Sequence, residues 1–481
     1  MYTIREIQNR IMTKQISCTE LTKLYLDAAA ADTLNAYITS TPEHALAAAG
    51  AVDRKIAAGE SLRPLEGVPV CVKDNISTAG ILTTCASRML EDFVPFYDAH
   101  AWTLLKGQGA VLIGKGNMEE FAMGSTGETS RFGSTANPVD PRYVAGGSSS
   151  GCAAAVAGNL AVCAMGSDTG GSVRLPAAYC GAVGFKPTYG AASRRGLVAF
   201  ASSFDQIGPI GGCVEDVAAL LDAITGKDPG DMTHRGLTPV RPQLTGSVKG
   251  LRIGLAGEFF EELPASVAAA LTETVSVLEN AGAEIVKVRF PLLQTCLPLY
   301  YILSSAEASS NLGRYDGIRY GHRAPEGDTL HETICRSRSE GFGAEVKRRI
   351  LLGTYVLRAG YKDDYYGKAQ KLRLTVRAEL EKLFESCDLL LTPTVPHTAR
   401  QKGESLEPVQ TYRSDLCTVP ANIAGVPAVS VPCGRDENGL PIGLQLMGRA
   451  FRDGLVLNAA YAYELATAGA YLAKTDRGVR L

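Results

Sequence analysis

Three short apolar runs in the first third of the chain constrain its fold more than any other feature. They lie at residues 67–73, 109–117 and 160–168, and segments with helical patterning separate them. Such runs are typical of strands that are buried on both faces of a sheet. Strands that alternate with helices predict an α/β fold, in which helices cover both faces of the sheet.

The remaining segments extend this pattern. Ser17 and Glu20 have the spacing of a capping box at the start of a helix, and residues 251–290 predict a further strand–helix–strand unit. No repeat or low-complexity linker divides the chain, so we expect one domain over residues 1–481. Its predicted parts are N-terminal helices, a core, a helical excursion and C-terminal strands, at about 1–60, 61–225, 297–386 and 387–450.

Composition excludes several classes of protein. The net charge is −2, so the chain has no broad cationic field for nucleic acid or an anionic membrane. The first 15 residues carry charges throughout and do not resemble a signal peptide. The 12 cysteines are scattered without a C-x-x-C pair, which indicates buried, reduced thiols in the cytoplasm rather than disulfides or a zinc site.

A glycine-rich stretch around Ser172 is the first candidate for chemistry. Successive backbone N–H groups of Thr169, Gly170, Gly171 and Ser172 could point at one atom and form an oxyanion hole. A phosphate-binding loop would need a lysine that this stretch lacks. A serine nucleophile needs a base, but the flanking histidines are distant in sequence, at positions 100 and 234.

A second serine cluster offers a competing nucleophile. Ser149 lies in a G-x-S-x-G pattern, which resembles the nucleophile elbow of α/β-hydrolases. That motif needs a strand directly before it, whereas residues 137–147 contain two prolines and predict a loop. It also needs a late histidine, and nothing in the sequence supports a pairing with His322, His331 or His397. Helix capping by Ser149 and Ser150 is the better interpretation.

A lysine can serve as the base if burial keeps it neutral. Lys73 ends an apolar run and could therefore leave the core into a closed site. Ser148 could relay a proton from Ser172 to Lys73, because a hydroxyl both donates and accepts. The local sequence leaves open the alternative that Lys73 is an ordinary solvated lysine at a strand end.

Three motifs together resemble the amidase signature family: "GVPVCVKDN", "GGSSSG" and "GSDTGGSVRLPAAYCGAVGFKPTYG". The resemblance implies a large twisted mixed sheet and a serine–cis-serine–lysine triad that hydrolyses or transfers amides. Ser172 would be the nucleophile, Ser148 the bridging serine in a cis peptide, and Lys73 the base. The 24-residue spacing between the two serines agrees with the family pattern.

Within this family, five further stretches resemble the glutaminase subunits of tRNA-dependent amidotransferases. They lie at residues 116–130, 186–210, 304–321, 347–373 and 419–434. The resemblance implies that glutamine is cleaved through an acyl-serine and that the ammonia passes through a channel to a B-like subunit. That partner would use ATP and Mg²⁺ to convert Glu-tRNA(Gln) to Gln-tRNA(Gln). Asp-tRNA(Asn) remains open as a second target.

A C-like subunit would complete the heterotrimer that the resemblance implies. The tRNA would be held mainly by the B-like partner, and this chain would need no cofactor of its own. For glutamine, the resemblance assigns Asp415 to the α-ammonium group, Arg349 or its neighbour Arg348 to the α-carboxylate, and Tyr300 to the pocket wall.

Some positions depart from the pattern of those subunits, and they leave partner fit and substrate open. They are Ser150, Cys152, Leu175, Trp102 and Ala191, which stands where the pattern has an arginine after the glycine. Two alternatives follow: a stand-alone amidase for other small or aryl amides, or a scaffold without activity. The presence of Lys73, Ser148 and Ser172 together disfavours the scaffold.

Overall fold

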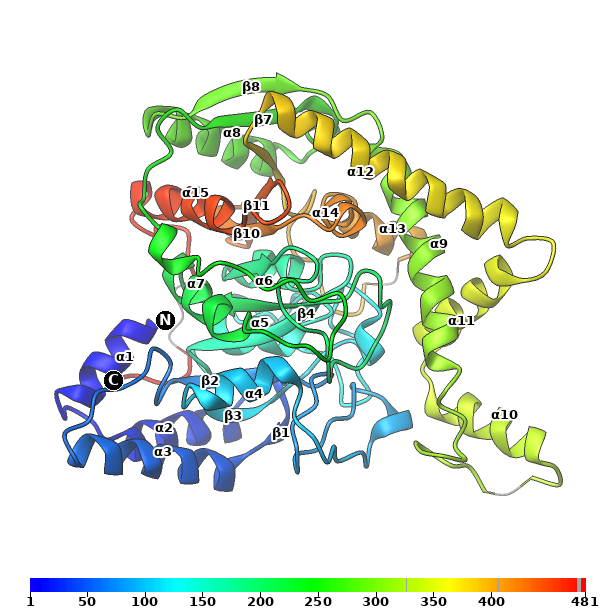
Figure 1. Cartoon of the computed structure of the whole chain (residues 1–481), viewed down its shortest axis with the longest axis horizontal. Helices are drawn as coiled ribbons and strands as arrows, with labels where there is room; N and C mark the ends of the chain where they lie inside the picture. Colours follow the sequence, from blue (N-terminus) through cyan, green and yellow to red (C-terminus); the bar gives the residue numbers. More distant parts are fainter. Residues whose placement is uncertain (326, 405, 474–476) are drawn as a thin grey trace.

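A computed structural model describes residues 1–481 except 326, 405 and 474–476. A mixed 11-stranded sheet runs through the molecule in the order β1-β3-β2-β4-β6-β5-β10-β11-β9-β7-β8 (Figure 1). The strands are β1 (Tyr37–Ser40), β2 (Pro69–Lys73), β3 (Val111–Gly116), β4 (Cys163–Asp168), β5 (Val183–Lys186), β6 (Gln206–Gly211), β7 (Arg252–Ala256), β8 (Glu284–Val288), β9 (Leu389–Pro393), β10 (Ala428–Arg435) and β11 (Pro441–Gly448). The predicted α/β class is confirmed.

The three apolar runs form the adjacent strands β3, β2 and β4. β2 pairs in parallel with both neighbours, and every residue of these three strands is buried. β5 and β6 are antiparallel to each other. β6 also pairs antiparallel with β4, so β4 has a parallel neighbour, β2, on one side and an antiparallel neighbour, β6, on the other.

Helices cover both faces of the sheet. They are α1 (Ile4–Met12), α2 (Cys18–Ala30), α3 (Pro42–Ala57), α4 (His100–Gly107), α5 (Ser150–Ala157), α6 (Arg174–Cys180), α7 (Val214–Ile224), α8 (Ala265–Asn280), α9 (Leu293–Leu312), α10 (Leu330–Gly341), α11 (Ala344–Leu357), α12 (Lys368–Ser386), α13 (Pro408–Tyr412), α14 (Val419–Ala424) and α15 (Asp453–Ala466). One apolar cluster joins the sheet to α1–α4, α7, α8 and α15, and a separate one joins it to α5 and α6.

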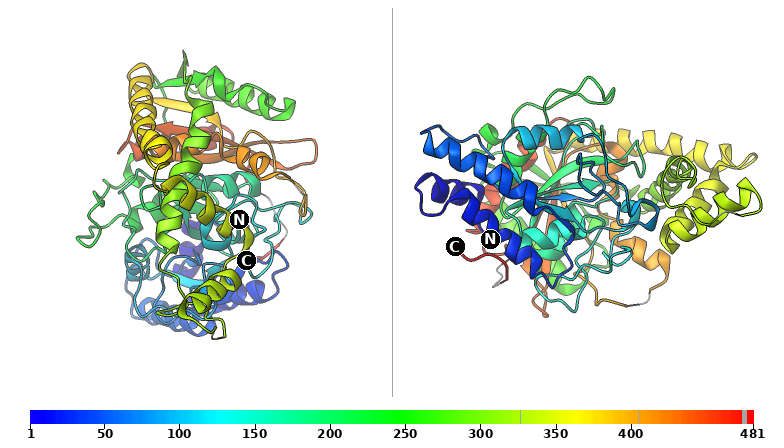
Figure 2. Two further views of the ribbon diagram at one scale, coloured as in Figure 1. Left: turned by 90° about the vertical axis from the view of Figure 1, so that its right-hand side faces the viewer. Right: turned by 90° about the horizontal axis from the view of Figure 1, so that it is seen from below.

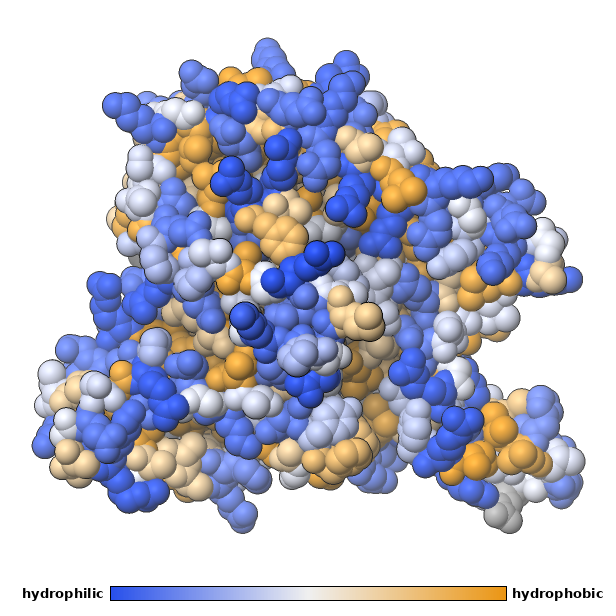
Figure 3. Space-filling model, in the orientation of Figure 1, coloured by the Kyte–Doolittle hydropathy of each residue, from blue (hydrophilic) through white to orange (hydrophobic). Residues whose placement is uncertain are grey.

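The predicted helical excursion forms α9 to α12, which extend away from the sheet (Figures 1 and 2). α9 packs along α11, and both α9 and α12 contact α14. A third apolar cluster, which includes Tyr300 and Tyr301, anchors this excursion. This cluster therefore joins the excursion to the core. Hydrophilic side chains cover much of the visible face of the molecule (Figure 3).

The predicted capping box and the predicted free cysteines are both present in the structure. Ser17 and Glu20 form a reciprocal capping box at the start of α2. All 12 cysteines are free, and 10 of them are buried; Cys213 is partly buried and Cys335 is exposed. In the part of the chain that the structure describes, no helix has the length and apolar character to cross a bilayer.

Candidate active site

Lys73 is the last residue of β2, and its side chain is fully buried. Its Nζ donates to Ser148 Oγ at 2.8 Å, Ser167 Oγ at 3.0 Å and the Ser167 carbonyl at 3.2 Å. Ser167 lies in the neighbouring parallel strand β4, so the shared carboxyl edge of the two strands brings these groups together. Lys73 is therefore not a solvated strand-end lysine.

The loop before α5 carries Ser148. The peptide bond between Gly147 and Ser148 is cis, the geometry that the resemblance implies. The Ser148 carbonyl accepts the Glu119 N–H at 3.1 Å, which fixes the backbone beside Lys73. Ser148 lies in an irregular segment just before the helix, so the strand that a nucleophile elbow requires is absent at this point.

The capping interpretation of the next two serines is wrong. Ser149 occupies the N-cap position of α5, but its side chain makes no capping bond and donates to the Ser167 carbonyl at 3.2 Å. Ser150 is the first residue of the helix, and its hydroxyl accepts from Thr135 Oγ1 at 3.1 Å. Both serines are fully buried and hold neighbouring segments together.

Ser172 follows Gly171 in the loop after β4 and is only 8% exposed. Its carbonyl accepts the Ser149 N–H at 3.1 Å, so the Ser172 loop contacts the segment that carries Ser148. Gly171 has φ +133°, and a Cβ at this position would lie 2.4 Å from Thr418 Oγ1. A Cβ at Gly170 would lie 2.5 Å from the Tyr300 ring. Both glycines are therefore required by close packing.

The loop offers fewer N–H groups for an oxyanion than the sequence predicts. The Gly171 N–H already donates to Asp168 Oδ1 at 2.9 Å, so this structure does not support its place in an oxyanion hole. Within the described residues, the N–H groups of Gly170 and Ser172 make no hydrogen bond outside regular structure. Those two N–H groups, with that of Thr169, remain the predicted donors.

A buried ion pair that the sequence analysis missed shapes this loop. Asp168 accepts two hydrogen bonds from Arg174, each of 3.0 Å, and both side chains are fully buried. Burial alone would raise the pKa of Asp168, but Arg174 and Asn422 hold it well below its usual range. Arg174 also donates to the Thr418 carbonyl at 3.0 Å. The pair therefore joins the Ser172 loop to the segment that leads into α14.

Three predicted glutamine-binding residues converge beside this loop. Tyr300 on α9 lies against Gly170, and its neighbour Tyr301 donates to Asp415 Oδ2 at 2.7 Å. Arg349 on α11 is 3% exposed and lies 4.4 Å from the centre of the Tyr301 ring. Tyr301 was missed because nothing in the local sequence separates it from Tyr300.

The structure separates the two candidate arginines. Arg349 is buried and donates to Glu345 Oε1 at 2.7 Å, whereas the Arg348 side chain is 48% exposed and pairs with Glu345 from the surface of α11. Neighbouring residues on a helix point about 100° apart, so only one of the two can face the site. Arg349 is that residue.

Burial shifts the pKa values of two groups in the site. Desolvation lowers the pKa of Lys73 to about 8, although the carboxylates of Asp168 and Asp205 oppose the shift. Desolvation raises the pKa of Asp415 to about 7, against the effects of the Tyr301 hydroxyl and Arg349. Lys73 can therefore lose its proton near neutral pH. A cation bound beside Asp415 would favour the ionised form of its carboxyl.

The five departures from the family pattern are packed in the interior. Trp102 on α4 is 5% exposed, and the other four, Ser150, Cys152, Leu175 and Ala191, are fully buried. Cys152 lies with its sulfur 3.9 Å from that of Cys71. Among the described residues, none of these side chains forms a hydrogen bond with Lys73 Nζ or with the Ser172 loop.

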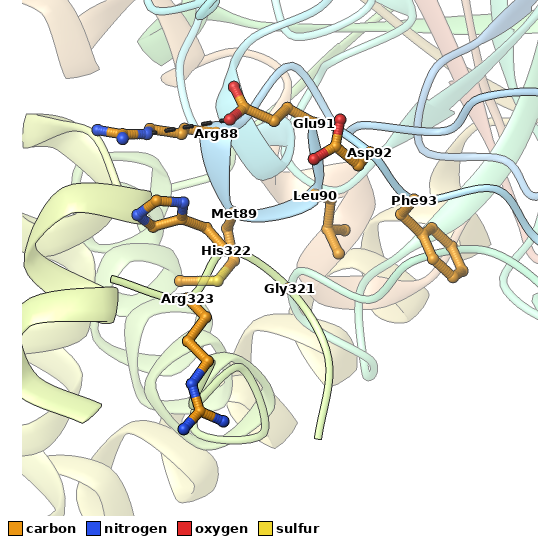
Figure 4. Close-up of a pocket in the computed structure, with 9 residues that line it drawn as sticks. All are labelled: Arg88, Met89, Leu90, Glu91, Asp92, Phe93, Gly321, His322 and Arg323. Atoms are coloured by element: carbon orange, nitrogen blue, oxygen red, sulfur yellow. Dashed lines mark ion pairs between the residues drawn. The ribbon is translucent and has the colours of Figure 1, made fainter. Parts of the chain in front are cut away.

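A separate pocket lies where residues 88–93 meet residues 321–323 (Figure 4). Arg88 and Glu91 form an ion pair of 4.0 Å at its edge, and the His322 N–H donates to the Met89 carbonyl at 2.8 Å. The residues that line it include none of those predicted for catalysis or glutamine binding. This pocket is distinct from the candidate active site.

Comparison with known proteins identifies the family of this chain. The family model described as Amidase matches residues 20–457. The chain belongs to the amidase family. Among curated amidase-family proteins, it is 50% identical over 473 residues to the glutamyl-tRNA(Gln) amidotransferase A-subunit of Thermosynechococcus vestitus, covering 97% of this chain and 98% of that protein. It is 51% identical to the protein of the same name from Carboxydothermus hydrogenoformans, with 96% of each chain covered.

Solved amidase-family structures have the same fold. The crystal structure of the glutamyl-tRNA(Gln) amidotransferase A-subunit from Thermotoga maritima matches with a TM-score of 0.80 and 39% identity, over 96% of this chain and 94% of that chain. The peptide amidase of Stenotrophomonas maltophilia matches with a TM-score of 0.82 and 31% identity, over 97% of each chain. The fold is therefore shared more widely than the sequence of any one subgroup.

Proposed function

We propose that this amidase-family chain is the glutaminase subunit of a glutamyl-tRNA(Gln) amidotransferase. The observation that carries the proposal is the position of Asp415 and Arg349 beside the Ser172 loop. One carboxyl and one guanidinium fit the two charges of an α-amino acid, and a buried lysine that hydrogen-bonds to a second serine fits the activation of a serine for amide cleavage. The identity of about 50% to proteins of that name, over almost the whole of both chains, supports the same function.

In the proposed reaction, neutral Lys73 accepts the Ser148 proton as Ser148 accepts the Ser172 proton. Ser172 Oγ then forms a bond to the side-chain carbonyl carbon of glutamine. The N–H groups of Gly170 and Ser172, with that of Thr169, would stabilise the oxygen that becomes negative. The proton returns through Ser148 to the departing nitrogen, ammonia leaves, and water cleaves the glutamyl ester to free glutamate and Ser172.

Glutamine recognition follows from charge. The α-ammonium group would supply the counter-charge that Asp415 lacks, because burial raises the pKa of this carboxyl to about 7. Arg349 would bind the α-carboxylate with the N–H groups that it does not donate to Glu345. Tyr300, against Gly170, would close the pocket beside the reacting amide.

The proposal extends to a complex. Ammonia would pass to a B-like subunit that uses ATP and Mg²⁺ to amidate Glu-tRNA(Gln), and a C-like subunit would complete a heterotrimer. The net charge of −2 suits a chain that leaves tRNA binding mainly to its partner. The second candidate is a stand-alone amidase, which the similarity to a peptide amidase favours.

Ammonia release from glutamine, measured with and without the B-like and C-like subunits, separates these functions. We expect glutaminase activity that the partners raise, and a loss on the order of 10⁴-fold in Ser172→Ala with an unchanged melting temperature. Rapid turnover of aryl or peptide amides with negligible glutaminase activity would favour the stand-alone enzyme. An active Ser172→Ala variant would exclude Ser172 as the nucleophile.

A further inference from the structure

Asn75 lies two residues beyond Lys73, and its side chain has one hydrogen bond. Its Nδ2 donates to Ser167 Oγ at 2.9 Å. The residue is 2% exposed, and its Oδ1 has no hydrogen-bond partner among the described residues. Burying an amide with an unpaired oxygen is unfavourable, so an apolar side chain would be more stable here. Such a group calls for a role other than packing.

The partner of Asn75 is the residue that holds the lysine. Ser167 offers both its hydroxyl and its carbonyl oxygen to Lys73 Nζ, at 3.0 and 3.2 Å. A neutral amine has two N–H groups and one lone pair. With two N–H groups on Ser167, the lone pair faces the remaining neighbour, Ser148 Oγ, at 2.8 Å. This orientation is the one that proton transfer from Ser148 requires.

We propose that Asn75 is a positioning residue for the lysine base: its side-chain N–H holds the Ser167 hydroxyl, and Ser167 aims Lys73 Nζ at Ser148. The inference rests on the proposed function, since it assumes that Lys73 accepts the Ser148 proton. Asn75 touches none of the reacting atoms. It acts through the second lone pair of a hydroxyl that Lys73 also uses.

The charge of the amide group also matters. The N–H end of Asn75, which carries partial positive charge, points toward the Lys73 site and disfavours an ammonium there. A carboxylate at position 75 would do the opposite and retain the proton on Lys73. The other titratable groups that face Lys73 are Cys152 on α5, Asp168 at the end of β4, Asp205 before β6 and Cys85 in the loop after β2.

The test uses the full chain with its partner subunits and two variants, Asn75→Ala and Asn75→Asp. For Asn75→Ala we expect kcat to fall by up to about 100-fold with KM little changed, because the base and not the substrate pocket is disturbed. For Asn75→Asp we expect the midpoint of the pH–rate profile to move upward, with activity partly recovered at high pH. Inactivation by phenylmethylsulfonyl fluoride, a probe of serine nucleophilicity, should show the same pH shift without glutamine.

Asn137→Asp is the matched control. Asn137 is also a buried amide, but it donates to the carbonyls of Val144 and Tyr179, away from Lys73. It should retain the wild-type pH midpoint even if its melting temperature falls. If Asn75→Asp does not fold, Asn75→Ser, which keeps a short donor, should lie between wild type and Asn75→Ala in kcat.

Failure of the Asn75 inference and failure of the lysine-base mechanism give different results. A wild-type pH midpoint and a kcat within twofold of wild type in the folded Asn75 variants would overturn this inference alone, provided that Lys73→Ala is inactive. Retained activity in Lys73→Ala would instead overturn the lysine-base mechanism on which the inference rests.

Discussion

Two fully buried lysines lie on neighbouring strands and have opposite surroundings. Lys115 on β3 donates to three oxygens, the Ile76 carbonyl and the hydroxyls of Thr78 and Thr83, and lies 3.8 Å from Asp74 Oδ1. Lys73 on β2 also has three oxygen neighbours, but among the described residues no carboxylate lies within 4.0 Å of its Nζ. Burial lowers the pKa of both lysines.

The difference shows what turns a buried lysine into a base. Lys115 has a counter-charge that favours the ammonium form, so its protonation stabilises the junction of β3 with the segment after β2. Lys73 has only neutral oxygens at contact distance. The lowering of its pKa by burial is therefore opposed more weakly, and the lysine can lose its proton. One lysine suits structure and its neighbour suits proton transfer. The two can be tested against each other with the same substitution.

The largest effect should come from Lys73→Met. We expect glutamine turnover to fall by about 10²–10⁴-fold, the range of a lost general base. The melting temperature should stay equal or rise, because an apolar side chain replaces a buried group that has no paired charge. Ammonia release and thermal unfolding, measured on the same preparation, test both parts. A strongly destabilised Lys73→Met protein would show that Lys73 is structural after all.

Lys115→Met should have the reverse result. Removing this cation leaves the Asp74 carboxylate buried and unpaired, which should cost about 3–5 kcal/mol of unfolding free energy in urea titrations. The fraction that remains folded should keep most of its turnover. Adding Asp74→Asn removes the stranded charge and should restore much of the stability. If the double variant is no more stable than the single one, the pair does not contribute as proposed.

The smallest effect is the pH dependence of the wild-type enzyme. Since the pKa of Lys73 is lowered to about 8, about half of the base is neutral at pH 8, nearly all of it is neutral above about pH 9, and the neutral fraction falls about tenfold for each unit well below pH 8. The value of kcat/KM should therefore rise with pH through a midpoint near 8 and level off above about pH 9. Lys115→Met should retain this midpoint. A flat profile between pH 6 and 8 would contradict a lysine base.

The local parts of this site could be predicted from the sequence. Apolar runs place Lys73 at the end of β2, and the parallel pairing of β2 and β4 explains why its Nζ reaches Ser167 near the end of β4. α6 was missed, because the glycine-rich stretch around Ser172 predicts no helix after it. The Asp168–Arg174 pair was also missed, since its value depends on burial, which the sequence does not show.

The proposed glutamine-binding residues were predicted only through resemblance. Tyr300, Arg349 and Asp415 lie more than 100 residues beyond Ser172, on segments that meet through tertiary packing. The choice between Arg348 and Arg349 depends on which face of α11 lies against α9. No periodicity in the sequence reports that choice, because both arginines belong to one run of charged residues.

The excursion from α9 to α11 supplies Tyr300, Tyr301 and Arg349, whereas the three groups of the proposed proton path come from the sheet and its loops. Most of the proposed amino-acid pocket is thus encoded apart from the proposed proton path, and Asp415 lies in a third stretch of the gene. Natural selection can rewrite which amide enters without disturbing how it is broken, and a protein engineer could do the same by grafting the insert together with the segment that carries Asp415.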